Sequence, residues 1–132
     1  MSERQKYVKR AAQVVHAVKL DLDCDGFTYR KWGGEQRCKP GDWLVCNPHE
    51  ADTYTVDAGS FGRTYRHLRD AAYVKTAPVW AERATAAGRI ETKEGSTSYE
   101  AGDYLVSNEE DGGDPYAVAS ETFDRTYEKA GS

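Results

Sequence analysis

Two stretches of the chain repeat each other almost residue for residue. Residues 41–47 have the sequence GDWLVCN, and residues 102–108 have the sequence GDYLVSN, an offset of 61. Five of the seven positions are identical, and one more exchanges tryptophan for tyrosine. An internal repeat constrains the fold strongly, because each copy must adopt the same local structure and bury its apolar face against a neighbour.

The repeat continues toward the C-terminal end of each copy. Residues 54–56 (YTV) return as residues 116–118 (YAV), and residues 61–65 (FGRTY) return as residues 123–127 (FDRTY), both at an offset of 62. The change of offset from 61 to 62 falls between the two conserved stretches, where a loop of variable length is expected. The two copies therefore have the same predicted order of turns and strands.

The 132-residue chain is divided by this repeat into a first unit, residues 1–70, and a second unit, residues 71–132. A unit of about 60 residues buries little surface by itself, so we expect the two copies to share a core or an interface. Residues 2–10 form a short polar and basic tail. Either Ser2 and Gln5 form a capping box that opens one helical turn, or this tail is loose.

Apolar and polar side chains alternate over residues 14–24 and 27–32, and short apolar segments such as residues 43–46 follow turn signals; both patterns are typical of β-strands. No segment has the 3.6-residue period of a long helix, and Ser120 is placed to cap a single helical turn in the second copy. We predict a mainly β fold of two repeated small β-sheet or half-barrel units, each with one short helical turn, related by a pseudo-twofold axis. A single barrel that shares strands between the copies is the alternative. The predicted strands comprise residues 14–24, 27–32, 43–46, 54–56, 64–68, 79–82, 90–93, 104–106 and 116–118.

Composition narrows the possible partners. The net charge of −4 argues against nucleic acid as a partner. The sequence has no run of 18 apolar residues, which argues against a membrane span, and its N-terminus lacks the apolar segment of a signal peptide. The three cysteines are an odd number. Together these features favour a cytoplasmic protein with free thiols.

The Gly-Asp-aromatic-Leu-Val strand and the Phe-x-x-Thr-Tyr tail resemble the motifs of a widespread family of small phage and prophage proteins of mostly unknown function. The second copy carries both motifs, at residues 102–106 and 123–127, with Tyr116 between them and Glu128 closing the tail. The first copy differs, because Arg66 replaces the closing acid. The resemblance implies a phage or prophage origin and brings no catalytic residues with it. The duplication suggests a fused pseudo-dimer.

An arginine and a tyrosine recur together, as Arg63 with Tyr65 and as Arg125 with Tyr127. A guanidinium group can hold a phosphate through paired hydrogen bonds, and aromatic rings and guanidinium planes stack on bases. With aromatic and basic side chains of the first copy, they are candidates for a pocket that binds an anionic aromatic ligand such as a nucleotide. The alternative is that the aromatic members close the two small cores and the arginines cover them. The predicted ligand-binding residues are Arg63, Tyr65, Arg125, Tyr127, Tyr29, Arg30, Trp32 and Arg37.

The acidic residues favour structural roles. Asp21, Asp23 and Asp25 resemble the opening of a calcium loop, but the twelfth position of that loop is a tryptophan where a bidentate glutamate is needed. We therefore predict a solvated strand end and no metal. Asp42 and Asp103 are the acids that recur in register. They are either a general acid and base pair or, as we favour, caps of their own turns.

The cysteines offer a further candidate site. Cys46 and His49 lie close in sequence, with Cys38 upstream, but a fourth zinc ligand is not evident. A Cys46 thiol activated by a histidine is a second possibility. The second copy has Ser107 in place of Cys46, so the repeat does not need this chemistry. We favour a small buried thiol on a core strand, and we predict no metal and no cofactor.

We predict a non-enzymatic binding module that captures a small anionic, nucleotide-like ligand or a host protein. Countering a host defence is one role for such a module if it is phage-encoded. The sequence contains no Ser-His-Asp, Walker or complete metal signature, which argues against catalysis. Two alternatives stay open: a small β-rich enzyme with its site at the junction of the repeats, and a structural or accessory phage protein that acts by homo-oligomerisation.

Overall fold

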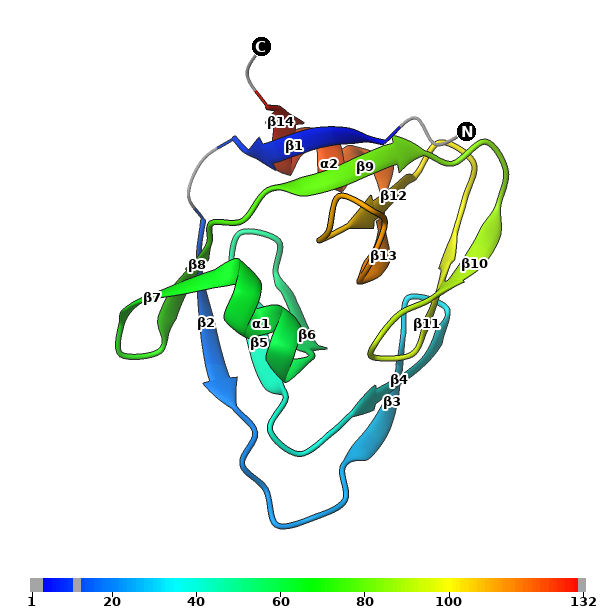
Figure 1. Ribbon diagram of the computed structural model, residues 1–132. Coiled ribbons are helices and arrows are strands. Elements are labelled where there is room, and N and C mark those ends of the chain that lie inside the picture. Colours follow the sequence, from blue (N-terminus) through cyan, green and yellow to red (C-terminus); the bar gives the residue numbers. More distant parts are fainter. Residues whose placement is uncertain (1–3, 11–12, 131–132) are drawn as a thin grey trace.

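The computed structural model describes residues 4–10 and 13–130 and is mainly β, as predicted from the sequence. Two short helices interrupt a series of short strands (Figure 1). The elements in chain order are β1 (Gln5–Lys9), β2 (Val14–Lys19), β3 (Phe27–Lys31), β4 (Gly34–Cys38), β5 (Trp43–Asn47), β6 (Asp52–Val56), α1 (Ala58–Thr64), β7 (Tyr65–Arg69), β8 (Ala72–Lys75), β9 (Val79–Arg83), β10 (Gly88–Glu91), β11 (Ser96–Tyr99), β12 (Tyr104–Ser107), β13 (Pro115–Val118), α2 (Ser120–Thr126) and β14 (Tyr127–Lys129).

Most strands belong to two antiparallel five-stranded sheets. Sheet I has the order β6-β5-β2-β8-β7, and sheet II has the order β13-β12-β9-β1-β14. The remaining strands form two hairpins, β3–β4 and β10–β11, which meet through a bridge between Gln36 and Gly95. The pseudo-twofold axis stays a prediction. No helix in the described ranges is both long enough and apolar enough to cross a membrane.

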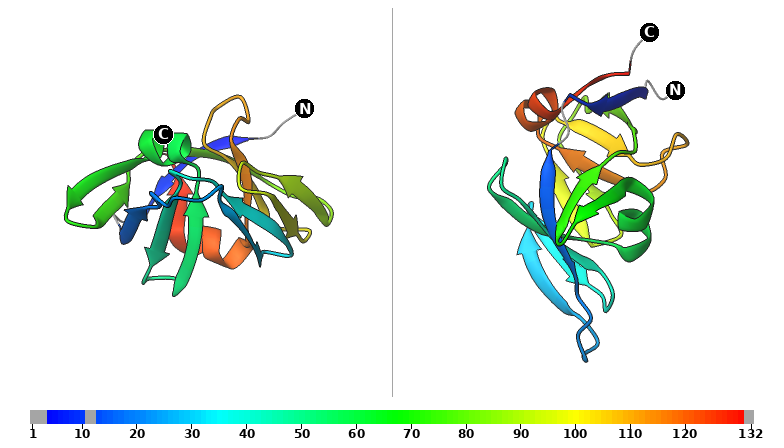
Figure 2. Two further views of the ribbon diagram at one scale, coloured as in Figure 1. Left: turned by 90° about the horizontal axis from the view of Figure 1, so that it is seen from below. Right: turned by 90° about the vertical axis from the view of Figure 1, so that its left-hand side faces the viewer.

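Each sheet contains one strand from the other predicted unit: β1 lies in sheet II and β8 lies in sheet I. Strand β1 lies between β9 and β14 in sheet II, whereas β2, which follows it directly, lies between β5 and β8 in sheet I. Figure 2 (right) shows β1 beside the C-terminal strand and apart from β2. In sheet I, β8 lies between β2 and β7. The division at residues 1–70 and 71–132 stays a prediction, and each sheet contains strands from both sides of it.

The two exchanged strands have a shared sequence. Strand β1 contains Tyr7-Val8-Lys9 and strand β8 contains Tyr73-Val74-Lys75. The prediction for the N-terminal tail is wrong over residues 5–9, because these residues form a paired strand rather than a helical turn or a loose end. Ser2 lies outside the described residues. The pattern of apolar and polar side chains did not reveal β1, because the strands that pair with it are more than 60 residues away in the sequence.

Other strand boundaries also differ from the prediction. The strand expected over residues 14–24 ends at Lys19, and residues 21–25 are exposed. The prediction from the sequence also missed β4, β8, β11 and β14. These strands have only three to five residues, and β4 and β11 are rich in polar side chains, so their hydrophobic patterns are too short or too weak to separate them from loops.

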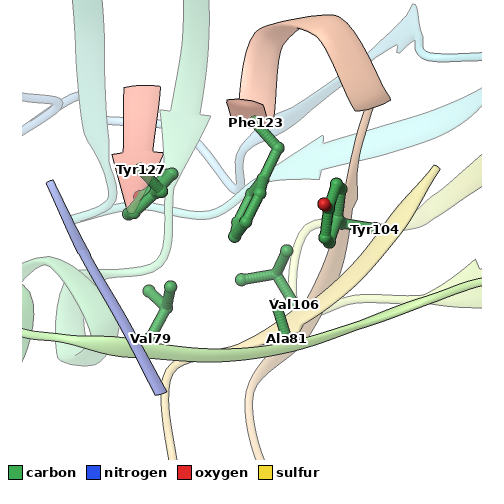
Figure 3. Packing of buried hydrophobic residues seen from close by; sticks show 6 residues of the cluster. All are labelled: Val79, Ala81, Tyr104, Val106, Phe123 and Tyr127. Carbon is green, nitrogen blue, oxygen red and sulfur yellow. The ribbon is translucent and has the colours of Figure 1, made fainter. Parts of the chain in front are cut away.

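Two aromatic clusters form the cores. In the cluster beside sheet II, the Phe123 ring from α2 lies between Tyr104 and Tyr127 over Val79, Ala81 and Val106 (Figure 3). The corresponding ring beside sheet I is Phe61 of α1, which stacks on Trp43 at 4.2 Å and on Tyr65 at 4.5 Å between ring centroids. The alternative reading of the Phe-x-x-Thr-Tyr tail, that its aromatic residues close the small cores, is therefore confirmed.

Asp42 and Asp103 hold the turns before the central strands. In the first copy Asp42 accepts hydrogen bonds from the backbone N–H groups of Lys39 (2.9 Å) and Ala58 (3.2 Å). In the second, Asp103 accepts from Glu100 (2.9 Å) and Ser120 (3.2 Å). The predicted capping role is confirmed, and each carboxylate also fastens the start of the following helix. Ser120 itself is not the cap, because α2 is preceded by Ala119, which has no side-chain oxygen.

Candidate functional site

A cavity of about 370 Å³ lies between the two sheets. Its size is that of small-molecule sites in proteins, which occur preferentially where two units meet. The edge strands β6 and β13, the exchanged strands β1 and β8, and the starts of β7 and β14 all contribute to its wall. Residues at matching places in the two copies line it in pairs: Tyr54 and Tyr116, Tyr65 and Tyr127, Lys9 and Lys75, Val56 and Val118, and Thr64 and Thr126.

Four tyrosines give the cavity its aromatic wall. Tyr54 and Tyr116 lie in the middle of the edge strands β6 and β13, whereas Tyr65 and Tyr127 follow directly after the two helices. The hydroxyls of Tyr54 and Tyr65 each shift the other's pKa, and so do those of Tyr116 and Tyr127. Burial raises the pKa of all four hydroxyls, so they remain neutral groups at physiological pH.

Two lysines bring positive charge into this cavity. The Nζ atom of Lys75 donates a hydrogen bond to the Tyr116 hydroxyl at 2.9 Å and lies 5.2 Å from the centre of the same ring. The Nζ atom of Lys9 lies 5.1 Å from the centre of the Tyr127 ring. Within residues 4–10 and 13–130, neither lysine forms an ion pair with a carboxylate within 4.0 Å.

The Lys9 ammonium group is unusually easy to deprotonate. Burial, followed by repulsion from Lys75, lowers its pKa to about 8, and attraction from Glu50 opposes this only in part. A positive charge that is removed from water without a paired anion is unfavourable, and its pKa falls in response. The cavity thus holds cationic charge that a bound anion would stabilise.

The acidic residues of the wall have partners of their own. Glu50 pairs with Arg125 at 2.5 Å, and Asp52 pairs with Lys31 at 2.7 Å. Asp114 accepts hydrogen bonds from the Ser60 hydroxyl and the Asn108 amide, and ion-pairs with Arg63 and Lys93. Glu94 accepts from the Asp57 N–H at 2.7 Å, and burial raises its pKa. These carboxylates are engaged with other groups, and the two lysines stay available to a ligand.

The structure places three of the eight predicted ligand-binding residues in the cavity wall. These are Tyr65, Tyr127 and Trp32. Arg63 and Arg125 lie outside the cavity, on the helices, where they ion-pair with Asp114 and Glu50.

The other three predicted residues lie on the β3–β4 hairpin and are not among the described residues that line the cavity. The Tyr29 hydroxyl bonds to the Thr55 hydroxyl at 2.5 Å, and Arg37 donates to the Asp25 carbonyl at 2.6 Å. Arg30 is exposed on β3.

Lys9, Lys75, Tyr54 and Tyr116 were not predicted as site residues. The one signal for the lysines was the repeated Tyr-Val-Lys triplet, at residues 7–9 and 73–75. Tyr54 and Tyr116 were recognised as repeated positions but were interpreted only as strand residues. Assigning all four to one cavity requires the strand exchange between the sheets.

The sequence candidates for metal and thiol chemistry lie apart from this cavity. Within the described ranges, no three His, Cys, Asp or Glu side chains are grouped so that they could hold a metal ion. The three acids at residues 21–25 are exposed, in line with the predicted solvated segment. Cys38 is buried on β4, but Cys46 is exposed on β5, so the prediction of a buried thiol on that core strand is wrong.

Comparisons of the chain with protein-family models, with curated proteins and with solved structures find no match, so the resemblance to small phage proteins stays a prediction.

Proposed function

We propose that the protein binds a small anionic, nucleotide-like ligand in the cavity between sheets I and II, as a binding module without turnover. The observation that carries this proposal is the pair of lysines, Lys9 and Lys75, which bring two ammonium groups into one cavity, with no carboxylate of the described residues within 4.0 Å of either. An anion that enters the cavity replaces lost hydration with charge-assisted hydrogen bonds, which are about twice as strong as neutral ones.

The aromatic wall supports the nucleotide-like part of the proposal. Tyrosine and tryptophan rings stack on nucleobases, with a contribution of about 1–3 kcal/mol per base. The four cavity tyrosines remain neutral hydroxyl donors, because burial raises the pKa of each. A phage-encoded protein that sequesters a nucleotide signal of a host defence would need such a cavity and no catalytic group.

Native mass spectrometry of the freshly purified protein tests this proposal. We expect a mass increment above the 14.7 kDa chain that disappears on denaturation and has the mass of a phosphorylated small molecule. Lys75→Met should remove the increment, because the variant loses the ammonium group that contacts Tyr116. Lys129→Met is the matched control, since Lys129 is exposed on β14 and should leave it unchanged.

Arg63→Ala and Arg125→Ala provide a second comparison, because both arginines were predicted from the sequence to contact the ligand. Their place outside the cavity predicts a smaller loss than that of Lys75→Met. The proposal fails if wild-type protein carries no increment and a panel of millimolar nucleotides does not raise its thermal midpoint.

Anion binding should weaken as the pH rises through about 8. Lys9 has a pKa of about 8 in the free protein and faces Lys75 and Glu50. A bound anion favours its charged form, so binding takes up a proton when Lys9 is initially neutral. From pH 7 to pH 9 the affinity for 5′-AMP should therefore fall by about tenfold. The second pKa of the phosphate is about 6, so the ligand does not titrate in this window.

Isothermal titration across this pH range measures the effect. Lys9→Met should bind more weakly at pH 7 and show a nearly flat profile, because the titrating group is gone. An unchanged slope in Lys9→Met would show that another group controls the pH dependence.

A further inference from the structure

The two positive charges of the cavity gather at one end, a feature that refines the proposed function and rests on it. Lys75 belongs to sheet I, but its Nζ atom reaches across to the Tyr116 hydroxyl of sheet II. Lys9 belongs to sheet II and lies over the ring of Tyr127, whose hydroxyl interacts electrostatically with that of Tyr116. Both ammonium groups are therefore collected around the tyrosine pair of sheet II.

The opposite tyrosine pair lies beside the aromatic ring of Trp32, over which the Nζ atom of Lys31, paired with Asp52, lies 5.2 Å from the ring centre. In the described part of the chain, no lysine or arginine hydrogen-bonds to the side chains of Tyr54 and Tyr65 or packs on their rings. The Trp32 ring lies 5.9 Å from the Tyr54 ring, at an interplanar angle of 53°. Trp32 lines the cavity and is 40% exposed, so part of its indole is accessible at the rim.

The backbone at Trp32 is held in an unfavourable conformation. Its φ angle of 57° lies in the left-handed region, which bulky side chains rarely adopt. The Trp32 carbonyl accepts a hydrogen bond from the Ser98 N–H at 2.9 Å, which fastens this turn to β11. Strained residues concentrate at ligand-binding positions, where the surrounding structure maintains them. Here the left-handed backbone places an indole beside Tyr54 at the cavity wall.

We infer that the ligand is a phosphate monoester of an aromatic base, of the 5′-mononucleotide class, with its phosphate between Lys9 and Lys75 and its base against Trp32 and Tyr54. A phosphate monoester carries nearly two negative charges at neutral pH and matches both ammonium groups. A phosphodiester carries one and leaves one buried ammonium group uncompensated, which is unfavourable.

Titrations with matched probes test the assignment of the phosphate. We expect 5′-AMP to bind about tenfold or more tightly than 3′,5′-cyclic AMP, and adenosine to bind most weakly, since a hydrogen bond to a charged group corresponds to about tenfold in affinity or more. Lys75→Met should reduce the preference for 5′-AMP over cyclic AMP, because one ammonium group then remains. Equal affinities for the two nucleotides in wild-type protein would overturn the inference.

The base end is tested with Trp32→Ala and a probe that has no base. The variant should weaken 5′-AMP by about fivefold or more and leave ribose 5-phosphate unchanged, since loss of a stacked ring corresponds to at least about 1 kcal/mol. Trp32→Phe, which keeps a ring, should restore most of the affinity. Phe27→Ala removes another exposed ring of the same hairpin, at 42% exposure, and should have no effect. Equal weakening of both probes by Trp32→Ala would refute the assigned orientation.

The failure of this inference differs from the failure of the proposed function. If the co-purified ligand is a phosphodiester or another singly charged anion that still depends on Lys75, the monoester assignment is wrong and the anion-binding function stands. If no anion binds, or if binding ignores both Lys75→Met and Lys9→Met, the function and the inference both fail.

Discussion

Phe123→Ala should lower the free energy of unfolding by about 3–5 kcal/mol, the usual effect of truncating a buried phenylalanine. Phe123 is 0% exposed and occupies the centre of the cluster beside sheet II. Its ring lies 4.1 Å from that of Tyr104, 4.8 Å from that of Tyr127 and 4.9 Å from that of Tyr7. The small helix and the strands around it can relax only in part, so a cavity would remain.

Urea denaturation followed by tryptophan fluorescence measures this change. Phe27→Ala is the matched control, because Phe27 is 42% exposed and its truncation should change stability by less than about 1 kcal/mol. Phe61→Ala tests the matching position beside sheet I, where the ring is 2% exposed, and should be comparably destabilising. A Phe123→Ala protein with unchanged stability would show that this cluster does not hold α2 on the sheet.

The local features of the fold could be predicted from the sequence, whereas its strand pairing could not. Short apolar segments that follow turn signals indicated β5, β6, β12 and β13, and the turn chemistry of Asp42 was correctly assigned. These features depend on residues within a few positions of each other. The exchange of β1 and β8 depends on pairing between distant segments, and a short strand has the same sequence pattern in either sheet.

The candidate site shows the same division. The tyrosines that follow the helices, Tyr65 and Tyr127, were predicted as ligand contacts because they belong to a conspicuous repeated motif, and both line the cavity. The arginines two positions earlier were predicted with them, but they lie on another side of the helix end, outside the cavity, where they ion-pair with Asp114 and Glu50 of its wall. Lys9 and Lys75 become neighbours only through the exchanged strands.

Deleting residues 1–10 should abolish the cooperative unfolding of sheet II. Strand β1 is an interior strand that pairs with β9 on one side and β14 on the other, so its loss leaves the backbone groups of both neighbours without partners. Its Tyr7 ring also packs against Phe123 and Tyr104. The combined loss should exceed about 5 kcal/mol, which is comparable to the total stability of a small domain.

Thermal unfolding followed by near-UV circular dichroism measures this loss, since most tyrosines of the cluster beside sheet II would lose their fixed environment. Deleting only residues 1–3, which precede β1, is the control and should preserve the transition. A synthetic peptide of residues 1–10 added to the shortened chain should restore the signal in proportion to its concentration, because the missing strand then pairs from solution. A shortened chain that melts at the wild-type temperature would show that sheet II is complete without β1.

The same peptide with Lys9→Met should restore the fold but not the affinity for 5′-AMP, because β1 supplies a central strand through its backbone and a cavity charge through Lys9. Restored folding without restored affinity would show that the anion site requires Lys9 on β1 and not only two folded sheets.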